Sequence, residues 1–424
     1  MKTLRKFLSV VLITAMSLTL LVGCEPKEHT DVSQNTENPG EITRGLSQDV
    51  FDLSFSQFME KETKGNYMVS PLSFKYALAL LLGGAKGETE AELLKAFGVK
   101  TAEEFTQKML KFNGFMARFE EGLKKDIKDH KDAVENGWAS PDTPEPFRAL
   151  KVANSVWRRS DFPELKSEYN DFVRKNFSAD SFTFTPDNVV KRVNEWANEK
   201  TESMIPELLD ESYDVSDLAV ILMNALYFKD SWVYRFSVEN SYQDDFFTLG
   251  GETVEKTYMK EQMDVLYYGD EETELVVLPM DGDVNMTFVL GSQENLGEKV
   301  KKATVRPVIV NIPKTEVESS FTGGELVRFL KSVGVEKIFT DEADFSKMSD
   351  RPIAVSDIIQ KTKLKLDETG CEAAALTAIL MYETAMPEEP KEPVEFKANK
   401  PFSMYLHTEL DGEAVVLLQG RIVE

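Results

Sequence analysis

The chain is short of cysteine, histidine and basic residues, and each shortage excludes a class of protein. Two cysteines among 424 residues cannot form a disulfide framework or a zinc site with four thiolate ligands. The three histidines, His29, His130 and His407, lie far apart and show no ligand spacing. Lys and Arg number 49 against 73 Asp and Glu, so the formal net charge is −24. Because phosphate binding needs clustered basic side chains, nucleic acid is excluded as the main partner.

Motifs of the common enzyme classes are missing as well. The sequence contains no glycine-rich phosphate loop, no GxSxG elbow and no HExxH helix. An acidic surface accounts for its many carboxylates, and no nucleophile, base and pocket can be aligned. We therefore expect a protein that is not an enzyme and that holds no cofactor and no metal.

The N-terminus has the pattern of an export signal. Lys2, Arg5 and Lys6 precede an apolar run over residues 7–22, which is too short and too rich in Ser and Thr for a transmembrane span. The run ends in Leu21-Val22-Gly23-Cys24, which resembles the bacterial lipobox, where Cys24 would become the lipidated first residue. A plain signal peptide with an incidental cysteine is the alternative.

A tether is expected between the lipid and the folded body. Residues 1–23 contain three basic groups and no acidic one, so their removal leaves a net charge of about −27. Residues 24–46 are rich in Glu, Thr, Asn, Pro and Gly and poor in large apolar side chains, as in a flexible linker. We expect an exported bacterial lipoprotein, attached to a membrane through its N-terminal lipid, at the periplasmic face or the cell surface of the envelope.

Residues 47–424 are expected to form one folded domain. Apolar periodicity predicts helices at residues 51–59, 72–82, 89–97, 101–127, 166–177, 188–205 and 324–333. Apolar or alternating runs predict strands at residues 152–157, 219–228, 274–280, 286–290 and 414–418. Ser70 and Pro71 suit an N-cap and a first helical position, whereas residues 128–147 have the composition of an exposed loop. Helices cluster early and strands late, so we predict a single α+β domain.

Residues 364–402 form the most informative segment, and their pattern alone permits two structures. One set of alternate positions is uncharged and begins with small side chains, namely Cys371, Ala373, Ala375, Thr377, Ile379 and Met381. A strand inserted at the centre of a sheet needs such a face, because an unpaired buried charge costs several kcal/mol. Alanine nevertheless favours helix over strand, so an Ala-rich helix ending at Pro387 is an equal alternative.

A resemblance decides between the two structures. Glu368-Thr369-Gly370-Cys371-Glu372-Ala373-Ala374-Ala375-Leu376-Thr377 resembles the hinge of the reactive-centre loop of inhibitory serpins. Further motifs similar to those of serpins occur in the family's order, at Asn66–Ser73, Met223–Trp232, Asn311–Lys314, Lys397–Phe402 and Gln419–Val423. Agreement of several separate motifs makes the resemblance specific. It implies the serpin fold, with a large mixed β-sheet, further sheets, about nine helices and an exposed reactive-centre loop at about residues 368–395.

The resemblance also implies a mechanism. In serpins a serine or cysteine protease attacks the exposed loop as if it were a substrate, and after acylation the N-terminal half of the loop inserts into the main sheet as a new strand. The protease stays attached in a covalent 1:1 complex, and its catalytic site is distorted. The resemblance therefore implies a monomeric suicide-type inhibitor whose partner is a target serine protease.

The cleaved bond follows from the position of the hinge. Counting from Glu368 as in the family places it between Thr384 and Ala385. Neighbouring positions are alternatives, namely Met381, Tyr382, Glu383 and Met386. No Lys or Arg lies between Asp367 and Pro390, which disfavours trypsin-like proteases and favours elastase-, subtilisin- or chymotrypsin-like targets.

Three groups of site residues are implied by the resemblance. The hinge comprises Glu368, Gly370, Cys371, Glu372, Ala373, Ala374, Ala375 and Thr377. The shutter beneath the centre of the sheet comprises Ser70, Ser73, Asn224 and Gln360, with Gln360 at the place of a family histidine. The breach comprises Trp232 and a salt bridge between Lys314 and Glu368. At the hinge, Gly370 allows the backbone to rotate without a Cβ, and Cys371 is interpreted as a small hydrophobic residue.

Two other functions are weighed against inhibition. A non-inhibitory serpin, acting as a binding or chaperone-like protein, usually carries bulky or charged hinge residues, where this chain has Ala373, Ala374, Ala375 and Thr377. A lipoprotein that binds sugars or nutrients needs a polar and aromatic pocket, which the sequence does not indicate. We therefore favour an inhibitor that protects a bacterial envelope from proteases of a host or of neighbouring cells.

Overall fold

The computed structural model describes residues 46, 49–141, 143, 145–216, 218–321, 324–355, 358–371 and 392–424. The expected signal peptide, the lipidation site Cys24 and nearly all of the tether lie outside these residues. So do the distal hinge and the candidates for the cleaved bond, namely Glu372, Ala373, Ala374, Ala375, Thr377, Met381, Tyr382, Glu383, Thr384, Ala385 and Met386. Within the described part, no helix is both long and apolar enough to cross a membrane.

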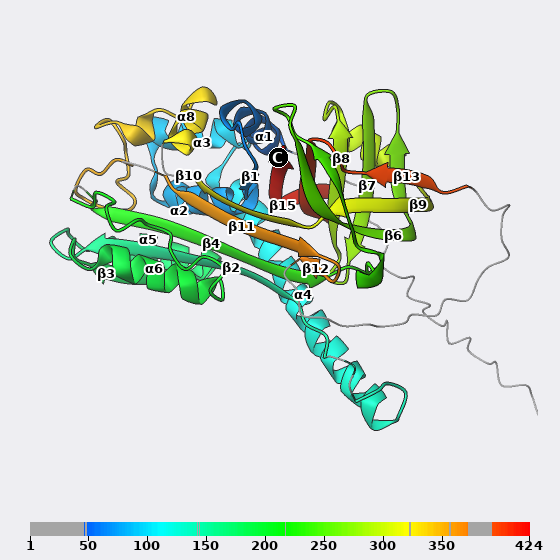
Figure 1. Ribbon diagram of the computed structural model, residues 1–424. Helices are drawn as coiled ribbons and strands as arrows, with labels where there is room; N and C mark the ends of the chain where they lie inside the picture. Colours follow the sequence, from blue (N-terminus) through cyan, green and yellow to red (C-terminus); the bar gives the residue numbers. More distant parts are fainter. Residues whose placement is uncertain are drawn as a thin grey trace, which may run out of the picture. The chain divides into compact units, whose positions relative to one another are not determined.

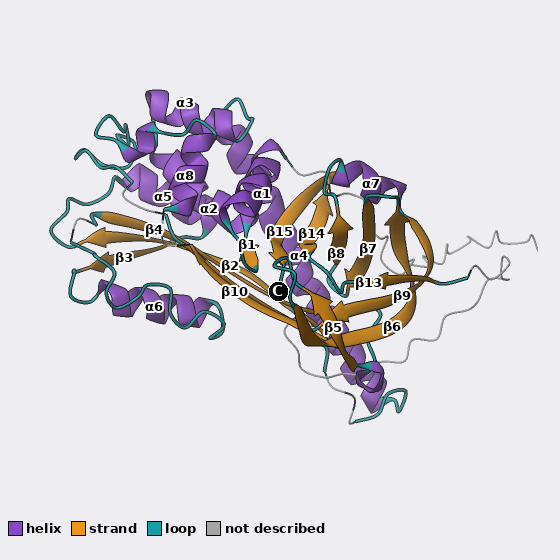
Figure 2. Cartoon of the chain, turned by 45° about the horizontal axis from the view of Figure 1, so that its top comes forward, coloured by secondary structure: helices purple, strands orange, loops and turns teal. Residues whose placement is uncertain are grey.

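Eight α-helices lie in the described residues, close to the number of about nine that the resemblance implies. They are α1 (Val50–Glu62), α2 (Pro71–Gly84), α3 (Gly87–Ala96), α4 (Ala102–Glu135), α5 (Ser167–Phe177), α6 (Val189–Lys200), α7 (Leu296–Lys302) and α8 (Glu325–Ser332). The described residues also contain two short 3₁₀ helices, η1 (Val238–Asn240) and η2 (Lys337–Phe339). α2 packs against the middle of a sheet on one face, and α6 lies on the opposite face (Figure 1, Figure 2).

The strands form two sheets, and the smaller one carries the segment of interest. Its order is β10 (Thr315–Phe321), β11 (Gln360–Asp367), β12 (Gly370–Cys371), β4 (Val220–Ser231), β2 (Ala149–Arg159) and β3 (Asp180–Phe184). The larger sheet runs β1 (Tyr67–Val69), β15 (Glu413–Ile422), β14 (Phe402–Leu410), β8 (Val284–Gly291), β7 (Thr273–Met280), β6 (Thr253–Gly269), β9 (Thr304–Pro313) and β13 (Val394–Lys397), with β5 (Tyr242–Phe247) paired to β6. Parallel and antiparallel pairs both occur, as in the mixed sheet that the resemblance implies.

α2 begins where the sequence predicts and is buried almost all round. Ser70 is its N-cap and Pro71 its first residue, and the Ser70 hydroxyl accepts a hydrogen bond of 3.0 Å from the Ser73 amide. Twelve of its fourteen residues are buried, because the helix lies between the sheets and the other helices. The Ser70 hydroxyl also donates 2.7 Å to the Leu417 carbonyl, so the cap ties α2 to β15 as well.

Two boundaries differ from the prediction. Residues 128–135, expected in a loop, continue α4, whose far end projects from the body in Figure 1. Charged pairs one turn apart, such as Lys128 with Asp132 at 3.4 Å, support the helix there without a buried face. α6 ends at Lys200 instead of 205, since Glu202 and Ser203 have φ angles of 50° and 67°, which a right-handed helix excludes.

Substitution of Ser70 by Ala should destabilise the protein more than loss of a helix cap alone. Ser70→Ala removes the cap and a buried hydrogen bond, so we expect the free energy of unfolding to fall by about 2 to 3 kcal/mol. Thr101→Ala is the matched control, since Thr101 caps the exposed start of α4 and should cost about 1 kcal/mol. Urea denaturation measures both, and equal losses would contradict the double role of Ser70.

Candidate functional site

The smaller sheet is interrupted at its centre. Among the described strands, β4 and β11 are joined only through the two residues of β12. Gly370 and Cys371 pair with Ser231 and Asp230 of β4 on one side, and with the end of β11 on the other. Below this short ladder, β4 and β11 line a cavity of about 430 Å³. A sheet of this form has room at its centre for one further strand.

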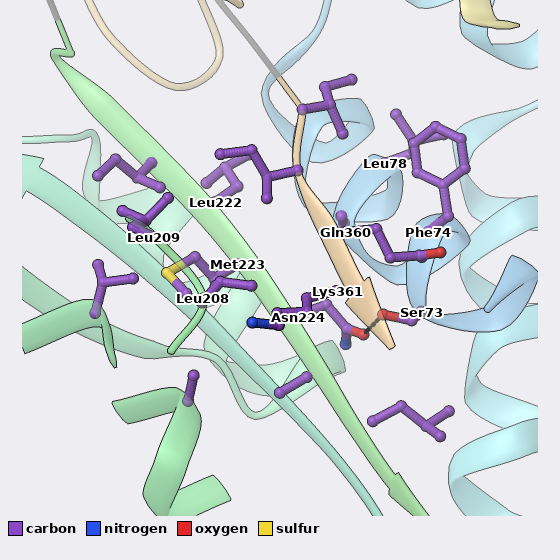
Figure 3. A pocket seen from close by; sticks show the side chains of 18 of the residues that line it. Ser73, Phe74, Leu78, Leu208, Leu209, Leu222, Met223, Asn224, Gln360 and Lys361 are labelled. Carbon is purple, nitrogen blue, oxygen red and sulfur yellow. Dashed lines mark hydrogen bonds between the residues drawn. The ribbon is translucent and has the colours of Figure 1, made fainter. Parts of the chain in front are cut away.

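The walls of the cavity are mostly apolar, with a small polar group at the middle (Figure 3). On one face lie Phe74 and Leu78 of α2, and on the other lie Leu208 and Leu209 from the segment that follows α6. The charged residues among the described lining are basic, namely Arg159, Arg351, Lys361, Lys363 and Lys365, and no Asp or Glu is among them. An extended segment with an uncharged inner face suits the apolar walls.

The four predicted shutter residues are brought together at this middle. The Ser73 hydroxyl donates to the side-chain oxygen of Asn224 on β4, across the space between α2 and the sheet (Figure 3). Gln360 of β11 makes two hydrogen bonds to the backbone of Ser70. Its side-chain oxygen accepts from the Ser70 amide at 2.9 Å, and its Nε2 donates to the Ser70 carbonyl at 2.9 Å. Glutamine can donate and accept at once, so Gln360 clamps β11 to the start of α2.

Two further residues of this network, Asn154 and Thr362, were not predicted from the sequence. Asn154 of β2 lies opposite Asn224 in the ladder, and its side-chain oxygen accepts 2.7 Å from Asn224 Nδ2. The side-chain Nδ2 of Asn154 donates a hydrogen bond of 2.9 Å to the Phe177 carbonyl. Thr362 of β11 donates to the Met68 carbonyl at 2.5 Å. In the sequence, Asn154 is a polar residue within an apolar strand run. The structure buries it, and a buried side-chain amide needs a hydrogen-bonding partner.

The described part of the hinge forms a tight hairpin between β11 and β12. Asp367 Oδ1 accepts hydrogen bonds from the Thr369 amide at 2.9 Å and from the Thr369 hydroxyl at 2.6 Å. A Cβ at Gly370 would lie 2.1 Å from the Asp230 carbonyl oxygen. Glycine is therefore required here by the close approach of β4, an additional reason to the backbone freedom expected from the sequence. Cys371 is 1% exposed, in keeping with its interpretation as a small hydrophobic residue.

The breach residues hold this hairpin from the side. Trp232 donates from its ring Nε1 to the Asp367 carbonyl at 2.9 Å and from its amide to the Thr369 carbonyl at 3.0 Å. Lys314 Nζ lies 2.7 Å from Glu368 Oε1, as the resemblance implies. Ser241, which sequence analysis missed, donates 2.6 Å to the same oxygen. Burial tends to raise the pKa of Glu368, but the hydrogen bonds from Lys314 and Ser241 outweigh it and hold the pKa below its usual range.

Comparisons with known proteins agree with this geometry. The family model described as Serpin (serine protease inhibitor) matches residues 47–424. The leukocyte elastase inhibitor of Bos taurus is 28% identical over 397 residues, covering 87% of this chain and 95% of that protein. An uncharacterized serpin-like protein of Methanosarcina mazei is 26% identical over 432 residues and covers 94% of each chain.

Solved structures give the same result for the fold. The crystal structure of Serpin48, a highly specific serpin of the insect Tenebrio molitor, aligns with a TM-score of 0.66 at 26% identity, covering 88% of this chain and 96% of that one. Tengpin, a thermophilic serpin in its native state, aligns with a TM-score of 0.67 at 23% identity, covering 88% and 93%. Because Tengpin is only 23% identical to this chain, its similarity supports the fold alone.

Glu368→Gln should weaken the breach at neutral pH and have little effect in acid. A depressed carboxyl pKa adds stability above the pKa of the unfolded chain, and that stability is lost as pH falls through the lower folded pKa. We expect the variant to be less stable than the parent by roughly 1 to 3 kcal/mol at pH 7, with the two converging near pH 3. Denaturant unfolding at both pH values measures this, and a difference that persists at pH 3 would contradict the ion pair with Lys314.

Proposed function

The chain belongs to the serpin family, and on that premise we propose that it is a suicide-type inhibitor of serine proteases whose cleaved loop inserts between β4 and β11. The family and its elastase-inhibitor relatives identify a protease inhibitor and not an enzyme. The observation that carries the finer proposal is the interrupted sheet, in which β12 already occupies the first two positions of a further strand. Insertion then only has to extend a ladder that has begun.

Extending the register of β12 places the small hinge residues on the buried face. With Cys371 opposite Asp230 and Leu366, Ala373 would follow opposite Phe228 and Leu364. Ala375 would meet Leu226 and Thr362, and Thr377 would meet Asn224 and Gln360. These β11 partners are all buried, so this face of the new strand would lie on the core. Small, uncharged side chains meet that requirement with little steric cost.

The same register gives the outward face a favourable charge pattern. Glu372 would lie opposite Lys229 on one side and Lys365 on the other. Opposite charges directly across a sheet stabilise the pairing, typically by 0.2 to about 1 kcal/mol. Leu376 would lie on this same face, opposite Lys361 and the buried Ala225, on the side of the sheet that α6 covers. The first residue to enter after Cys371 is therefore one that the flanking strands attract.

The length of β4 is consistent with the expected position of the cleaved bond. β4 spans twelve residues, and the extended register would bring Met381 opposite Val220 at its far end. A cut between Thr384 and Ala385 would leave a segment long enough to fill the slot along the whole of β4. A cut at any of the alternative positions from Met381 onward would do the same, so the length of β4 agrees with all of these candidates and does not choose among them.

The composition of the loop indicates the class of target protease, and the N-terminal motif indicates where the protein acts. The absence of Lys and Arg between Asp367 and Pro390 favours elastase-, subtilisin- or chymotrypsin-like proteases, and the names of the relatives are compatible with an elastase. The lipobox-like Leu21-Val22-Gly23-Cys24 supports an exported bacterial lipoprotein on the cell envelope. We infer that the protein protects that envelope from such proteases, as a monomer that forms a covalent 1:1 complex.

A protease panel tests the inhibitory function directly. Mixing the protein with an elastase, a subtilisin and a trypsin should give an SDS-resistant complex with at least one of the first two. Mass spectrometry of the released C-terminal peptide then locates the cleaved bond. Cleavage of the loop should also raise the melting temperature sharply, because the inserted strand completes the sheet. Clean cleavage with full protease turnover and an unchanged melting temperature would contradict the proposal.

Charge at alternate hinge positions should separate inhibitor from substrate. Ala373→Glu would place a carboxylate on the buried face, so we expect the loop to be cleaved without trapping the protease. Ala374→Glu is the matched control, since position 374 would lie on the opposite face between Lys363 and Tyr227, where the lysine can pair with the new carboxylate, and should keep inhibition. The stoichiometry of inhibition measures both. If the two variants behaved alike, the register and the insertion argument would both be wrong.

A further inference from the structure

α4 continues well past the point where it packs against the rest of the chain. Its buried residues all lie between Phe105 and Phe119, and none of the described residues 120–135 is buried. These sixteen residues of helix span about 24 Å. An ion pair of 2.8 Å between Arg148 Nη1 and Asp126 Oδ2 holds the root of this stretch, and residues 127–139, which we call the projecting end, extend from the body in Figure 1. Among the described residues, the projecting end adds none to the hydrophobic core, so the stability of the fold does not explain it.

The projecting end closes in a well-formed helix cap. Gly137 has a φ angle of 73°, which favours glycine, and its amide donates to the Val134 carbonyl at 3.1 Å. The Trp138 amide donates to the Ala133 carbonyl at 2.8 Å. These two hydrogen bonds, with a left-handed glycine between them, are the Schellman motif. The backbone at the tip is therefore fixed, and Trp138 is held at a defined position.

Trp138 is the most exposed large apolar side chain in the described part of the chain, at 83%. In a Schellman cap the residue at this position commonly packs onto an apolar residue of the last turn, but here that residue is the small Ala133. The other tryptophans, Trp157, Trp196 and Trp232, are at most 5% exposed. Tryptophan is enriched among the residues that dominate protein–protein binding energies. An indole presented from a fixed tip therefore indicates a contact with another molecule.

The root of the projecting end lies beside the hinge. A Cβ at Gly282, in the turn between β7 and β8, would lie 2.0 Å from the ring of Phe119 on α4. The Gly282 amide donates to Asp230 Oδ2 at 2.8 Å, and Asp230 pairs with Cys371, the last described residue of the hinge. The place where α4 leaves the body and the place where the described hinge ends are therefore at the same end of the smaller sheet (Figure 1).

Chain length limits how far from this place a bound protease can be. The expected bond between Thr384 and Ala385 lies thirteen residues beyond Cys371. At no more than about 3.5 Å per residue, the bond is at most about 45 Å from the end of the described hinge. A protease of roughly 250 residues has a radius of gyration of about 18 Å and is therefore roughly 45 Å across. A protease on the bond is large enough to contact a projection that rises about 24 Å beside the hinge.

We propose that Trp138, at the tip of the projecting end, binds the target protease outside its active site and raises the rate at which the protease docks on the loop. The inference rests on the proposed inhibitory function. Charges around the tip are paired within this chain, Lys128 with Asp132 at 3.4 Å and Lys131 with Glu145 at 3.3 Å. The contact is therefore mainly apolar, and it fits a shallow apolar depression of the protease with an acceptor for the indole N–H.

Trp138→Ala tests the proposal without disturbing the fold, because the side chain is exposed. With a protease that forms the complex, the association rate constant should fall by at least about fivefold. The stoichiometry of inhibition should stay unchanged, since strand insertion does not involve the tip. Trp138→Phe should keep most of the rate, and Leu53→Ala, at an exposed apolar position of α1, should keep all of it. A rate for Trp138→Ala equal to that of the parent, or a change in stoichiometry alone, would contradict the proposal.

A second readout does not depend on inhibition. An elastase or subtilisin whose active site is covalently blocked cannot take the loop, so its binding to the immobilised protein reports contacts elsewhere. The parent should bind this blocked protease more tightly than Trp138→Ala, by a factor that changes little with salt, because the contact is apolar. If no covalent complex formed, the proposed function would fail, while this difference in binding would still decide the role of Trp138. Equal binding by the two proteins, or none by either, would overturn the inference.

A lipid surface is the other occupant to be tested, because the protein is proposed to be anchored to a membrane. The fluorescence of Trp138, taken as the difference between the parent and Trp138→Phe, should not shift when vesicles of phosphatidylglycerol and phosphatidylethanolamine are added. A blue shift on the vesicles, together with an unchanged association rate for Trp138→Ala, would assign the tip to the membrane and overturn the inference.

Discussion

The structure depends on a ladder that is not closed at the centre of a sheet. β4 and β11 each pair on their outer side, and among the described strands only the two residues of β12 join them. Each backbone hydrogen bond that a further strand would add is worth about 0.5 to 1.5 kcal/mol. A strand the length of β4 would add many of them together, so the present fold holds a large gain in reserve. The proposed insertion of the cleaved loop would draw on that reserve.

Different contacts hold the slot at its middle and at its upper end. At the middle, Gln360 and Ser70 exchange two hydrogen bonds, and Asn224 joins Ser73 to Asn154. These hydrogen bonds lie between apolar walls, where a low local dielectric strengthens them. In the proposed insertion, the same side chains would form hydrogen bonds to the incoming strand instead. At the upper end, Glu368 is held by Lys314 and Ser241, and the backbone of Trp232 holds the turn. The described residues of the hinge, up to Cys371, are thereby held at the end of the slot.

Local pattern was a good guide wherever a segment's own side chains decide its structure. Ser70 and Pro71 start α2 because capping and a fixed φ angle act within one turn. The run over residues 219–228 is confirmed as a strand, since a continuous apolar stretch of that length suits the centre of a sheet. Pattern was less reliable for charged segments, as the extension of α4 through residues 128–135 shows, because exposed helices leave no apolar stripe.

The sequence by itself determined the class of fold and the family motifs, because these depend on short stretches of residue types, and it predicted which residues would meet at the shutter and the breach. It could not reveal the contacts of Asn154 or Ser241. Each acts through partners far away along the chain, and hydrogen-bond geometry and burial between distant segments exist only after folding. Only the tertiary structure decided that the hinge hairpin begins a strand between β4 and β11, since that depends on how far apart two separately formed edges come to lie.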